Sequence, residues 1–269
     1  MTPNPLAGTG EAAPTPPRPR RVFRRIRVTR TEQLSPHMVR VTFTGDDLSA
    51  FAWNGPAAHI KLVFPEAGQV EPALPQPEGP RPNNIRTYTP RRFDPAVPEL
   101  DVEFVLHGDG PASNWASQVQ VGQSLVLAGP GPNYQVDPAA DWFLLAGDDT
   151  AIPAISTILD ALPAATRAIV ILEVQDPQEE QALHSAAALE VTWLHRGSNQ
   201  PDALLEQALR DFSLPSGDGR IYVGAESGAM RRIRQHLLRE RGLDARQIVT
   251  RGYWKAGATN YTDHDYGTD

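Results

Sequence analysis

The sequence has no cysteine, and this absence excludes disulfide bonds, thiolate-bound metals, iron–sulfur clusters and a cysteine nucleophile. It has no uninterrupted apolar run close to the roughly 20 residues that a membrane-spanning helix needs. The N-terminus has no continuous apolar segment of the secretory type. Basic residues are in the minority, with 25 Lys and Arg against 32 Asp and Glu, which argues against a general nucleic-acid-binding protein. We therefore expect a cytoplasmic monomer with no membrane span and no nucleic-acid partner.

The composition between the two ends of the chain fits folded domains. Hydrophobic residues make up 40% of the 269 residues, enough for a core in two modest domains or one large one. Residues 1–20 are rich in Pro, Gly and Ala without a periodic apolar pattern, which predicts a disordered tail. Residues 259–269 form an acidic C-terminal tail.

The first half of the chain alternates apolar and polar residues at period two, which is typical of half-buried antiparallel strands. Such strands are predicted at residues 38–45, 59–64, 85–93, 99–106 and 123–129. The arginine-rich stretch 18–30 predicts an edge strand, whose basic face is either simply solvated or attracts an acidic ligand. With the proline-rich 65–82 as a surface loop, these strands predict a small antiparallel β-barrel domain over residues 21–136.

The pattern changes near residue 137. Continuous apolar runs at 141–147, 168–174 and 221–225 indicate strands that are buried on both faces of a parallel sheet. Helices are predicted between them at 151–161, 201–210 and 228–241, the last ending at Gly242. Residues 137–258 are therefore predicted to form an α/β domain, which makes the fold class a two-domain one.

The segment IRTYTPRR (85–92) combines a cation with a flat ring on one face of a strand. Arg86 and Tyr88 are two residues apart and point the same way, whereas the Thr89 side chain is turned away from them. An arginine can bind a pyrophosphate through two parallel hydrogen bonds, and a tyrosine can stack on a planar cofactor. The alternative is an ordinary strand that leads into a turn.

The segment HGDGPASNWA (107–116) looks like a phosphate-binding turn without its third glycine. Gly108 and Gly110 have the spacing of a dinucleotide fingerprint, but Ser113 stands where the third glycine belongs. The preceding strand alternates, as barrel strands do, so we reject a Rossmann site and keep an anion site at the start of a short helix. His107 is either a ligand contact or a structural histidine.

Two later segments carry polar groups at predicted strand ends. In LLAGDDTAIPAI (144–155), Asp149 or Thr150 is a candidate helix N-cap, and this edge suits nicotinamide or ribose hydroxyls better than phosphate. In VTRGYWKAG (249–257), predicted to follow a final strand, aromatic and cationic residues gather either as packing at a domain seam or as a floor beside a cofactor. The segment GAESG (224–228) has its serine one place too late for a nucleophile elbow, and no HExxH-type spacing occurs. No catalytic nucleophile and no metal ligand is predicted.

Taken in order, these motifs resemble those of the siderophore-interacting protein family, which consists of flavin-dependent ferric-siderophore reductases related to ferredoxin reductases. The resemblance extends from about Arg21 to Gly257. It rests on Arg86–Thr89, HGDGPASNWA (107–116), AGDDTAIPAI (146–155), GAESGAMRRIRQHLLRERGLD (224–244) and GYWKAG (252–257).

The resemblance implies FAD bound non-covalently on the barrel, NADPH or NADH as electron donor, and a ferric siderophore as substrate. The cofactor-binding residues that it implies are Arg86, Thr87, Tyr88, Thr89, His107, Gly110, Pro111, Ala112, Ser113, Trp115, Asp148, Asp149, Thr150 and Trp254. The substrate-binding residues that it implies are Lys61, Arg251 and Lys255. Hydride would pass from the nicotinamide to FAD, and single electrons would then pass to Fe(III).

One position departs from the family pattern. Many relatives have Gly-Pro-Arg-Gly-Ser after the last barrel strand, whereas this chain reads GPGPNY (129–134), so Gly131 replaces a basic residue on the substrate side. Two alternatives to the reductase with a nicotinamide donor stay open. One is a reductase fed by ferredoxin or another protein donor, and the other is a non-catalytic flavin- or siderophore-binding module.

Overall fold

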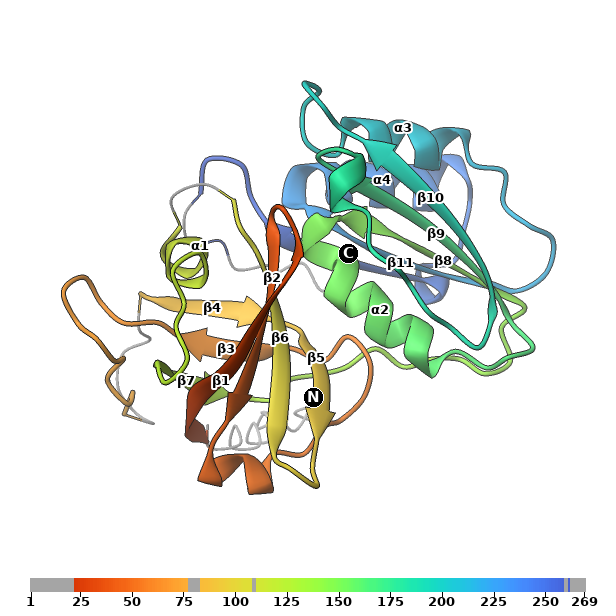
Figure 1. Ribbon diagram of the computed structural model, residues 1–269. Helices are drawn as coiled ribbons and strands as arrows, with labels where there is room; N and C mark the ends of the chain where they lie inside the picture. Colours follow the sequence, from red (N-terminus) through yellow and green to blue (C-terminus); the bar gives the residue numbers. More distant parts are fainter. Residues whose placement is uncertain (1–21, 77–82, 108–109, 259–260, 262–269) are drawn as a thin grey trace, which may run out of the picture.

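A computed structural model describes residues 22–76, 83–107, 110–258 and 261 of the chain. In this part of the protein, a seven-stranded antiparallel sheet is followed by a five-stranded parallel sheet, and the two lie side by side (Figure 1). The antiparallel sheet forms a half-barrel with strand order β4-β3-β7-β1-β2-β6-β5. The parallel sheet has strand order β10-β9-β8-β11-β12. The predicted fold class is confirmed.

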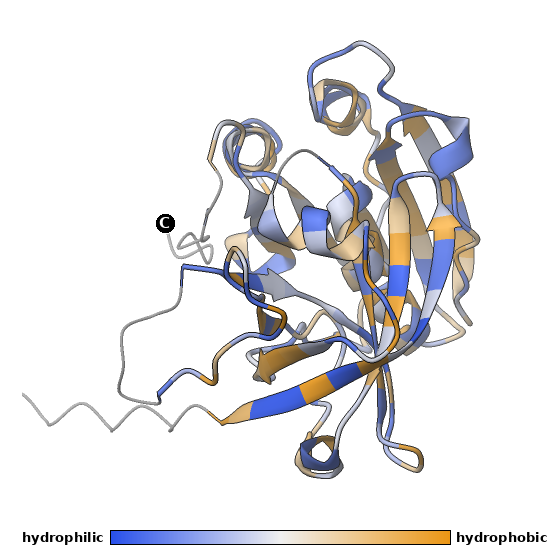
Figure 2. Cartoon of the chain, turned by 60° about the vertical axis from the view of Figure 1, so that its left-hand side comes forward, coloured by the Kyte–Doolittle hydropathy of each residue, from blue (hydrophilic) through white to orange (hydrophobic). Residues whose placement is uncertain are grey.

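Alternation of apolar and polar residues produces the half-barrel, and Figure 2 shows it as orange and blue bands along the strands. Apolar side chains such as Ile26, Phe43 and Phe104 point into a core between its strands and are fully buried. Its strands are β1 (Phe23–Ser35), β2 (Met38–Thr44), β3 (Ile60–Val63), β4 (Ile85–Tyr88), β5 (Pro90–Asp94), β6 (Glu99–Val105) and β7 (Ser124–Ala128). A 3₁₀ turn (Asp46–Ala50) and the short helix α1 (Pro111–Ala116) complete it.

Two expectations about the barrel strands are wrong. The arginine-rich strand β1 is not an edge strand, because it pairs with β2 on one side and with β7 on the other. The expected single strand 85–93 is two strands, β4 and β5, which lie at opposite edges of the sheet. Pro90 has no N–H group to donate to a ladder, so the chain leaves the β3 side after Tyr88 and re-enters the sheet beside β6.

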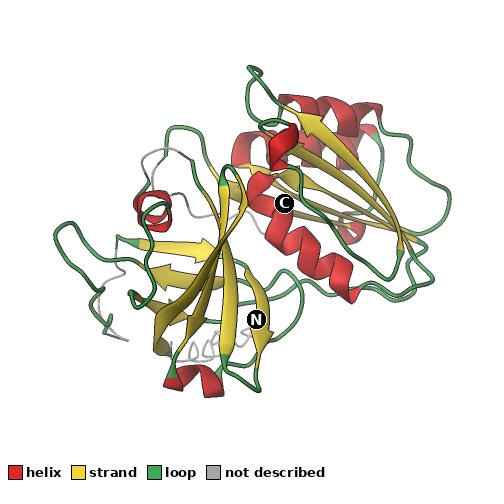
Figure 3. Ribbon diagram, viewed as in Figure 1, coloured by secondary structure: helices red, strands yellow, loops and turns green. Residues whose placement is uncertain are grey.

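The parallel sheet is buried on both faces, as its continuous apolar runs require (Figure 3). Helix α2 covers the face toward the half-barrel, and α3 and α4 cover the other face. The strands are β8 (Trp142–Asp148), β9 (Arg167–Val174), β10 (Ala188–His195), β11 (Gly219–Glu226) and β12 (Ile248–Trp254). The helices are α2 (Ile152–Ala161), α3 (Ala203–Asp211) and α4 (Ser227–Gln235), which continues as a π-helical turn (His236–Glu240), and 3₁₀ turns occur at Asp149–Ala151, Pro177–Glu179 and Ala245–Gln247.

Two strands of this sheet differ from expectation. β10 was not predicted, because it is an edge strand whose residues are mostly exposed and mixed in polarity. β12 extends to Trp254, so Arg251, Tyr253 and Trp254 lie within the last strand and not after it. The expected end of the last helical segment is confirmed by Gly242, which adopts a left-handed backbone with φ of 70°. No helix in the described part of the chain combines the length and apolar character that crossing a bilayer requires.

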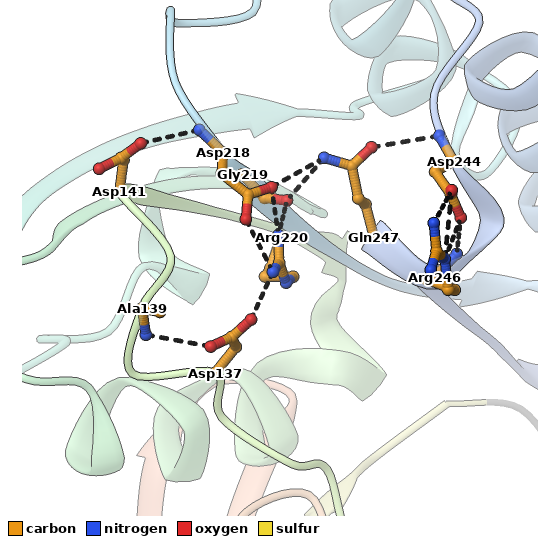
Figure 4. Close-up of polar contacts among 9 residues, drawn as sticks. All are labelled: Asp137, Ala139, Asp141, Asp218, Gly219, Arg220, Asp244, Arg246 and Gln247. Atoms are coloured by element: carbon orange, nitrogen blue, oxygen red, sulfur yellow. Dashed lines mark hydrogen bonds and ion pairs between the residues drawn. The ribbon is translucent and has the colours of Figure 1, made fainter.

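The connection between the two sheets is held by a polar network at the amino ends of the parallel strands (Figure 4). Arg220 binds the carboxylate of Asp137, in the connecting segment, and that of Asp218. Asp141 accepts a hydrogen bond from the backbone N–H of Asp218 at 2.8 Å, and Gln247 donates to Asp218 at 3.2 Å. These contacts fix the connection at the edge of the sheet opposite the carboxyl ends of its strands.

A second set of contacts joins the half-barrel to the turn after β9 and to helix α2 of the parallel-sheet half. The buried carboxylate of Glu179, after β9, accepts hydrogen bonds from the Ser35 hydroxyl at 2.5 Å and the His37 backbone N–H at 3.2 Å. Its other oxygen lies 2.5 Å from His37 Nδ1. Arg91 in β5 also binds Asp160 in α2 at 2.8 Å. Glu179 therefore holds the tip of the β1–β2 hairpin against the turn after β9.

Candidate functional site

The candidate site lies where the end of β6 meets the carboxyl ends of β8 and β12. The indole Nε1 of Trp254, at the end of β12, donates to the Asp148 carboxylate at 2.6 Å. The ring of His107, just after β6, lies 6.4 Å from the Trp254 ring between centroids. Desolvation beside the indole lowers the pKa of His107 below its ordinary value of 6.5. The two sheets thus meet through predicted site residues, at the edge where open α/β sheets bind ligands.

Asp148 organises the start of the helical segment after β8. Its carboxylate accepts a hydrogen bond from the Thr150 backbone N–H at 2.9 Å and another from the Thr150 hydroxyl. Asp148, and not Asp149 or Thr150, is therefore the N-cap, and it caps a 3₁₀ turn that leads into α2. One buried carboxylate thus fixes both the helix start and the indole of Trp254.

Acidic side chains crowd this edge of the parallel sheet. Burial, followed by the charge of Asp149, raises the pKa of Asp148, and burial, followed by the charge of Asp148, raises the pKa of Asp202. Arg196 lies 3.7 Å from a carboxylate oxygen of Asp149 and 3.7 Å from one of Glu173. Because nearby cationic charge is already shared among these acids, the edge does not favour a further phosphate.

Asp202→Asn is expected to stabilise the protein at high pH. One carboxylate oxygen of buried Asp202 accepts the Glu226 backbone N–H at 2.8 Å, and the other lacks a hydrogen-bond partner. Burial and the charge of Asp148 raise the pKa of Asp202 to about 8, so the stability tied to its protonated form is fully present below its ordinary pKa of 3.8 and is lost as the pH rises through about 8. Asparagine keeps the acceptor and tolerates the left-handed backbone, which has φ of 62°.

We expect the Asp202→Asn variant to gain about 1–3 kcal/mol in the free energy of unfolding near pH 8. The gain should shrink as the pH is lowered toward 3.8, the ordinary pKa of the carboxyl. Urea unfolding at several pH values measures it. Asp47→Asn, at an exposed position, is the control. A gain that does not depend on pH would show that Asp202 is ionised in the folded protein.

The predicted residues of β4 lie on the other side of the site. The Tyr88 ring packs 4.5 Å from the Phe104 ring between centroids, and burial raises its pKa above the ordinary value of 10.0. Arg86 is half-buried, and its guanidinium donates to the backbone carbonyl of Asn83 at 3.0 Å. The Thr87 hydroxyl, on the opposite face of β4, accepts a hydrogen bond from Lys61 at 3.2 Å. Thr89 lies in the break between β4 and β5.

Helix α1 carries the predicted phosphate-side residues. Gly110 precedes it, and a Cβ atom there would meet none of the described residues within 4 Å, so these residues leave the approach to the helix start open. Pro111 occupies its first turn, and Ala112 and Ser113 are buried. The Trp115 ring packs 5.7 Å from Phe104 and near-parallel to Phe43, which gives it a role in the barrel core. Gly108 and Asp109 of the same motif lie outside the described residues.

The predicted substrate-side cations lie on three different segments. Lys61 is in β3 and Arg251 in β12, and both are half-buried. Lys255 is exposed, immediately after β12. Tyr253, from the segment VTRGYWKAG, packs against Gly224 and shares a 2.5 Å hydrogen bond with the buried Tyr222 hydroxyl. It belongs to the core of the parallel sheet.

The chain matches two family models. Residues 27–134 match the siderophore-interacting FAD-binding domain, and residues 140–257 match the siderophore-interacting protein model. The chain belongs to the siderophore-interacting protein family. The predicted resemblance is confirmed.

Named relatives of this family member include reductases. Ferric vibriobactin reductase of Vibrio cholerae is 34% identical over 88% of this chain and 90% of its own length. The NADPH-dependent ferric-chelate reductase of Escherichia coli is 30% identical over 90% of this chain and 98% of its own length. A crystal structure of a siderophore utilization protein from T. fusca is 36% identical, covers 91% of this chain and 97% of its own, and superposes with a TM-score of 0.83.

The matched barrel domain is an FAD-binding domain, and the hydrogen-bond donors and aromatic groups on the half-barrel fit this cofactor. A cofactor with two phosphates and a flat ring needs cationic and backbone N–H donors beside an apolar surface. Arg86 supplies the cation, the open start of α1 after Gly110 supplies N–H groups, and Tyr88 supplies an aromatic surface. Among the described residues, no cluster of three or more His, Asp or Glu side chains is arranged to hold a metal ion.

Reasoning from the sequence missed several polar residues of this region. Arg196 and Asp202 lie at the two ends of the connection between β10 and α3, and no motif marks them. Glu226 caps α4 by accepting the Gly228 and Ala229 backbone N–H groups at 2.6 and 3.0 Å. The start of α4 is therefore occupied by the protein's own carboxylate. His59, two residues before Lys61 in the predicted strand 59–64, carries no sequence signal that marks it as part of the site.

Proposed function

We propose that this chain is a flavin-dependent ferric-siderophore reductase that uses FAD with NADPH or NADH. The observation that carries the proposal is the meeting of the two sheets at His107, Trp254 and Asp148. It supports the proposal, because the half-barrel residues proposed to hold FAD would then open toward the carboxyl edge of the parallel sheet. Electron transfer from a nicotinamide to a ferric chelate needs these two surfaces to open onto one site.

The predicted cofactor-binding residues of the half-barrel would contact different parts of FAD. Arg86 and the N–H groups at the start of α1 would hold the FAD phosphates, while Tyr88, Thr87 and Thr89 would contact the ring. His107 and Trp254 would close the seam on the other side of the cofactor. The remaining cofactor contacts of the proposal come from Pro111, Ala112, Ser113 and Trp115.

Asp148, Asp149 and Thr150 would line the side that receives the pyridine nucleotide. Their crowding with Asp202 makes this edge acidic, so it suits the hydroxyl and amide groups of a nicotinamide nucleoside better than its phosphates. The bond from Trp254 to Asp148 would hold the indole in place while nucleotides bind and leave.

The bound flavin would supply the redox chemistry, accepting two electrons as a hydride and passing them on singly to iron. The chain's own part is to position the partners and to set the charge around them. Because Fe(II) binds hard oxygen ligands less tightly than Fe(III), reduction would release iron from the chelate. No side chain is required as a nucleophile.

Two measurements test the proposal. Anaerobic stopped-flow mixing of the FAD-loaded protein with NADPH and, separately, with NADH should bleach the flavin absorption. A ferrous-trapping dye should then report reduction of ferric chelates. Absence of bleaching with both nucleotides, combined with reduction by a reduced ferredoxin, would favour a protein donor. A protein that takes up FAD but reduces no chelate from any donor would be a binding module.

The substrate side of the proposal rests on Lys61, Arg251 and Lys255. Lys61 and Lys255 are the only lysines in a sequence that has 25 Lys and Arg residues in total, and both belong to the proposed site. Cations around the site would concentrate an anionic ferric chelate, and salt should weaken that attraction. Acetylation of amines followed by mass spectrometry can therefore follow the site directly, because bound chelate should protect these two side chains.

Lys255→Ala is expected to weaken binding of an anionic ferric chelate about two- to fivefold without loss of FAD. One exposed charge contributes up to about 1 kcal/mol to such an attraction. The KM for a ferric tris-catecholate at low and high salt measures the effect, which should be smaller at high salt. Arg239→Ala, an exposed cation in the π-helical turn after α4, is the charge-matched control. An unchanged KM across several ferric chelates would remove Lys255 from the site.

The proposal also includes a monomer that acts in the cytoplasm, where nicotinamide nucleotides are held reduced. Sedimentation of the FAD-loaded protein tests the first part, and fractionation of cells that produce it tests the second.

A further inference from the structure

The side chain of His59 lies directly against the backbone of Gly131. A Cβ atom on Gly131 would lie 2.2 Å from His59 Nε2 and 2.4 Å from His59 Cε1, closer than any real contact allows. The Gly131 backbone N–H also donates to the His59 carbonyl oxygen at 2.7 Å. The imidazole therefore fills the space that a side chain at residue 131 would need, and it does so next to β3.

Two cations, one from each sheet, act on the imidazole of His59. Lys61 lies two residues along the same segment, and Arg251 lies on β12 of the parallel sheet. Burial is the main cause that lowers the pKa of His59, and the charges of Lys61 and Arg251 lower it further. The Pro132 carbonyl oxygen accepts a hydrogen bond from the ring and acts in the opposite direction. Burial and two neighbouring cations thus both disfavour the protonated form of this half-buried histidine.

An anion bound beside Lys61 and Arg251 would favour the protonated form of His59. Negative charge beside Lys61 and Arg251 offsets their repulsion and attracts a proton to the imidazole, which works against the cost of burial and raises the pKa of the ring. We propose that His59 is a specificity-determining residue of the substrate face, which takes up a proton when an anionic ferric chelate binds beside Lys61 and Arg251. The inference rests on the proposed function above, and it assigns a further cation to the place where Gly131 has no side chain.

The consequence is discrimination by charge. A trianionic tris-catecholate chelate gains an additional cation from protonated His59, whereas an uncharged tris-hydroxamate chelate does not. The proton is bound more tightly in the complex than in the free protein. Binding of the anionic chelate is therefore strongest below the pKa of His59 in the free protein, which lies under the ordinary 6.5, and weakens as the pH rises through the higher pKa of the complex.

Isothermal titration calorimetry tests the proposal on the FAD-loaded protein without any redox step. The probes are the gallium(III) complexes of a hexadentate tris-catecholamide and of an uncharged hexadentate tris-hydroxamate, because gallium replaces iron but is not reduced. Titrations between about pH 6 and pH 8, in buffers with different ionisation enthalpies, give the number of protons taken up on binding.

The wild-type protein should take up a proton with the tris-catecholamide complex and none with the tris-hydroxamate complex. His59→Gln should abolish this uptake and weaken binding of the tris-catecholamide complex about tenfold near pH 6, with a smaller difference near pH 8. His184→Gln, at an exposed position near the start of β10, is the control and should behave like the wild type. Equal proton uptake by His59→Gln and the wild type would overturn the inference.

Gly131→Ala provides a second variant in which the histidine is kept. The added Cβ atom must displace the imidazole, so proton uptake with the tris-catecholamide complex should fall although His59 is present. Unchanged uptake in this variant would contradict the placement of the ring in the site.

The proposed function and this inference fail in different ways. If the wild-type protein reduces ferric chelates and binds the gallium complexes, but with no proton uptake that depends on His59, only the inference is wrong. If the FAD-loaded wild type neither binds a gallium complex nor reduces a ferric chelate, both are wrong.

Discussion

Arg86→Gln is expected to yield a protein that loses FAD during purification. Arg86 is the cation of the proposed cofactor site on the half-barrel, and its guanidinium is already directed by bonds to the Asn83 and Ile85 carbonyls at 3.0 and 2.9 Å. A guanidinium held in one orientation can pair with a phosphate through two parallel hydrogen bonds, which a glutamine amide cannot replace. The loss should amount to about 2–4 kcal/mol, which corresponds to an FAD Kd raised about thirty- to a thousandfold.

Titration of the apoprotein with FAD, followed by quenching of flavin fluorescence, measures this change. Arg27→Gln is the matched control, because Arg27 is an exposed arginine of β1 in the same sheet. It removes the same charge and should leave the Kd within about twofold. If both variants bind FAD as the wild type does, the phosphates are held elsewhere and the assignment of Arg86 is wrong.

Glu179→Ala is expected to have the largest effect on stability. The buried carboxylate accepts hydrogen bonds from the Ser35 hydroxyl and the His37 backbone N–H, and its second oxygen contacts the His37 ring. These partners belong to the tip of the β1–β2 hairpin, so the substitution leaves the buried Ser35 hydroxyl without its acceptor at the contact between the two sheets, whereas the exposed His37 ring can be hydrated. Removing one member of such a buried set costs about 2–4 kcal/mol of the free energy of unfolding.

Urea unfolding, followed both by circular dichroism and by flavin release, measures the loss in the Glu179 variant. Because the Glu179 contact joins the two sheets, flavin release and the loss of secondary structure should no longer coincide in the variant. Glu180→Ala is the control, since the adjacent Glu180 is exposed and pairs with His195 on the surface. A loss no larger than that of the control would mean that the hairpin contact does not hold the two sheets together.

The local pattern of the sequence was sufficient to predict which sheet is antiparallel and which is parallel. Period-two alternation around Phe43 and Phe104 predicted a half-buried antiparallel sheet, and continuous apolar runs such as 141–147 predicted a buried parallel one. Both patterns reflect which faces of a strand are covered, so they can be read without knowing the neighbours. β10 could not be predicted in this way, because an exposed edge strand needs neither regular alternation nor a continuous apolar run.

The position of strands in the sheet was not readable in the same way. β1 was expected at an edge because of its exposed arginines, yet it pairs on both sides, since one face of a central barrel strand can be solvated. The stretch around Thr89 and Pro90 looked like one continuous strand. Only the pairing partners of β4 and β5, which lie far away in the sequence, show that the chain crosses between opposite edges of the sheet.

By itself the sequence determined the fold class, the family and the segments that carry the candidate site, including Arg86–Thr89, the 107–116 turn and the last strand. These depend on residue type and on order along the chain. The tertiary structure alone decided which side chains act together: Asp148 with Trp254, Asp202 with Asp148, Glu179 with His37, and His59 in the space over Gly131. The two residues of each pair are more than 50 positions apart in the sequence. Only packing brings them to the short distances at which hydrogen bonds and charges act.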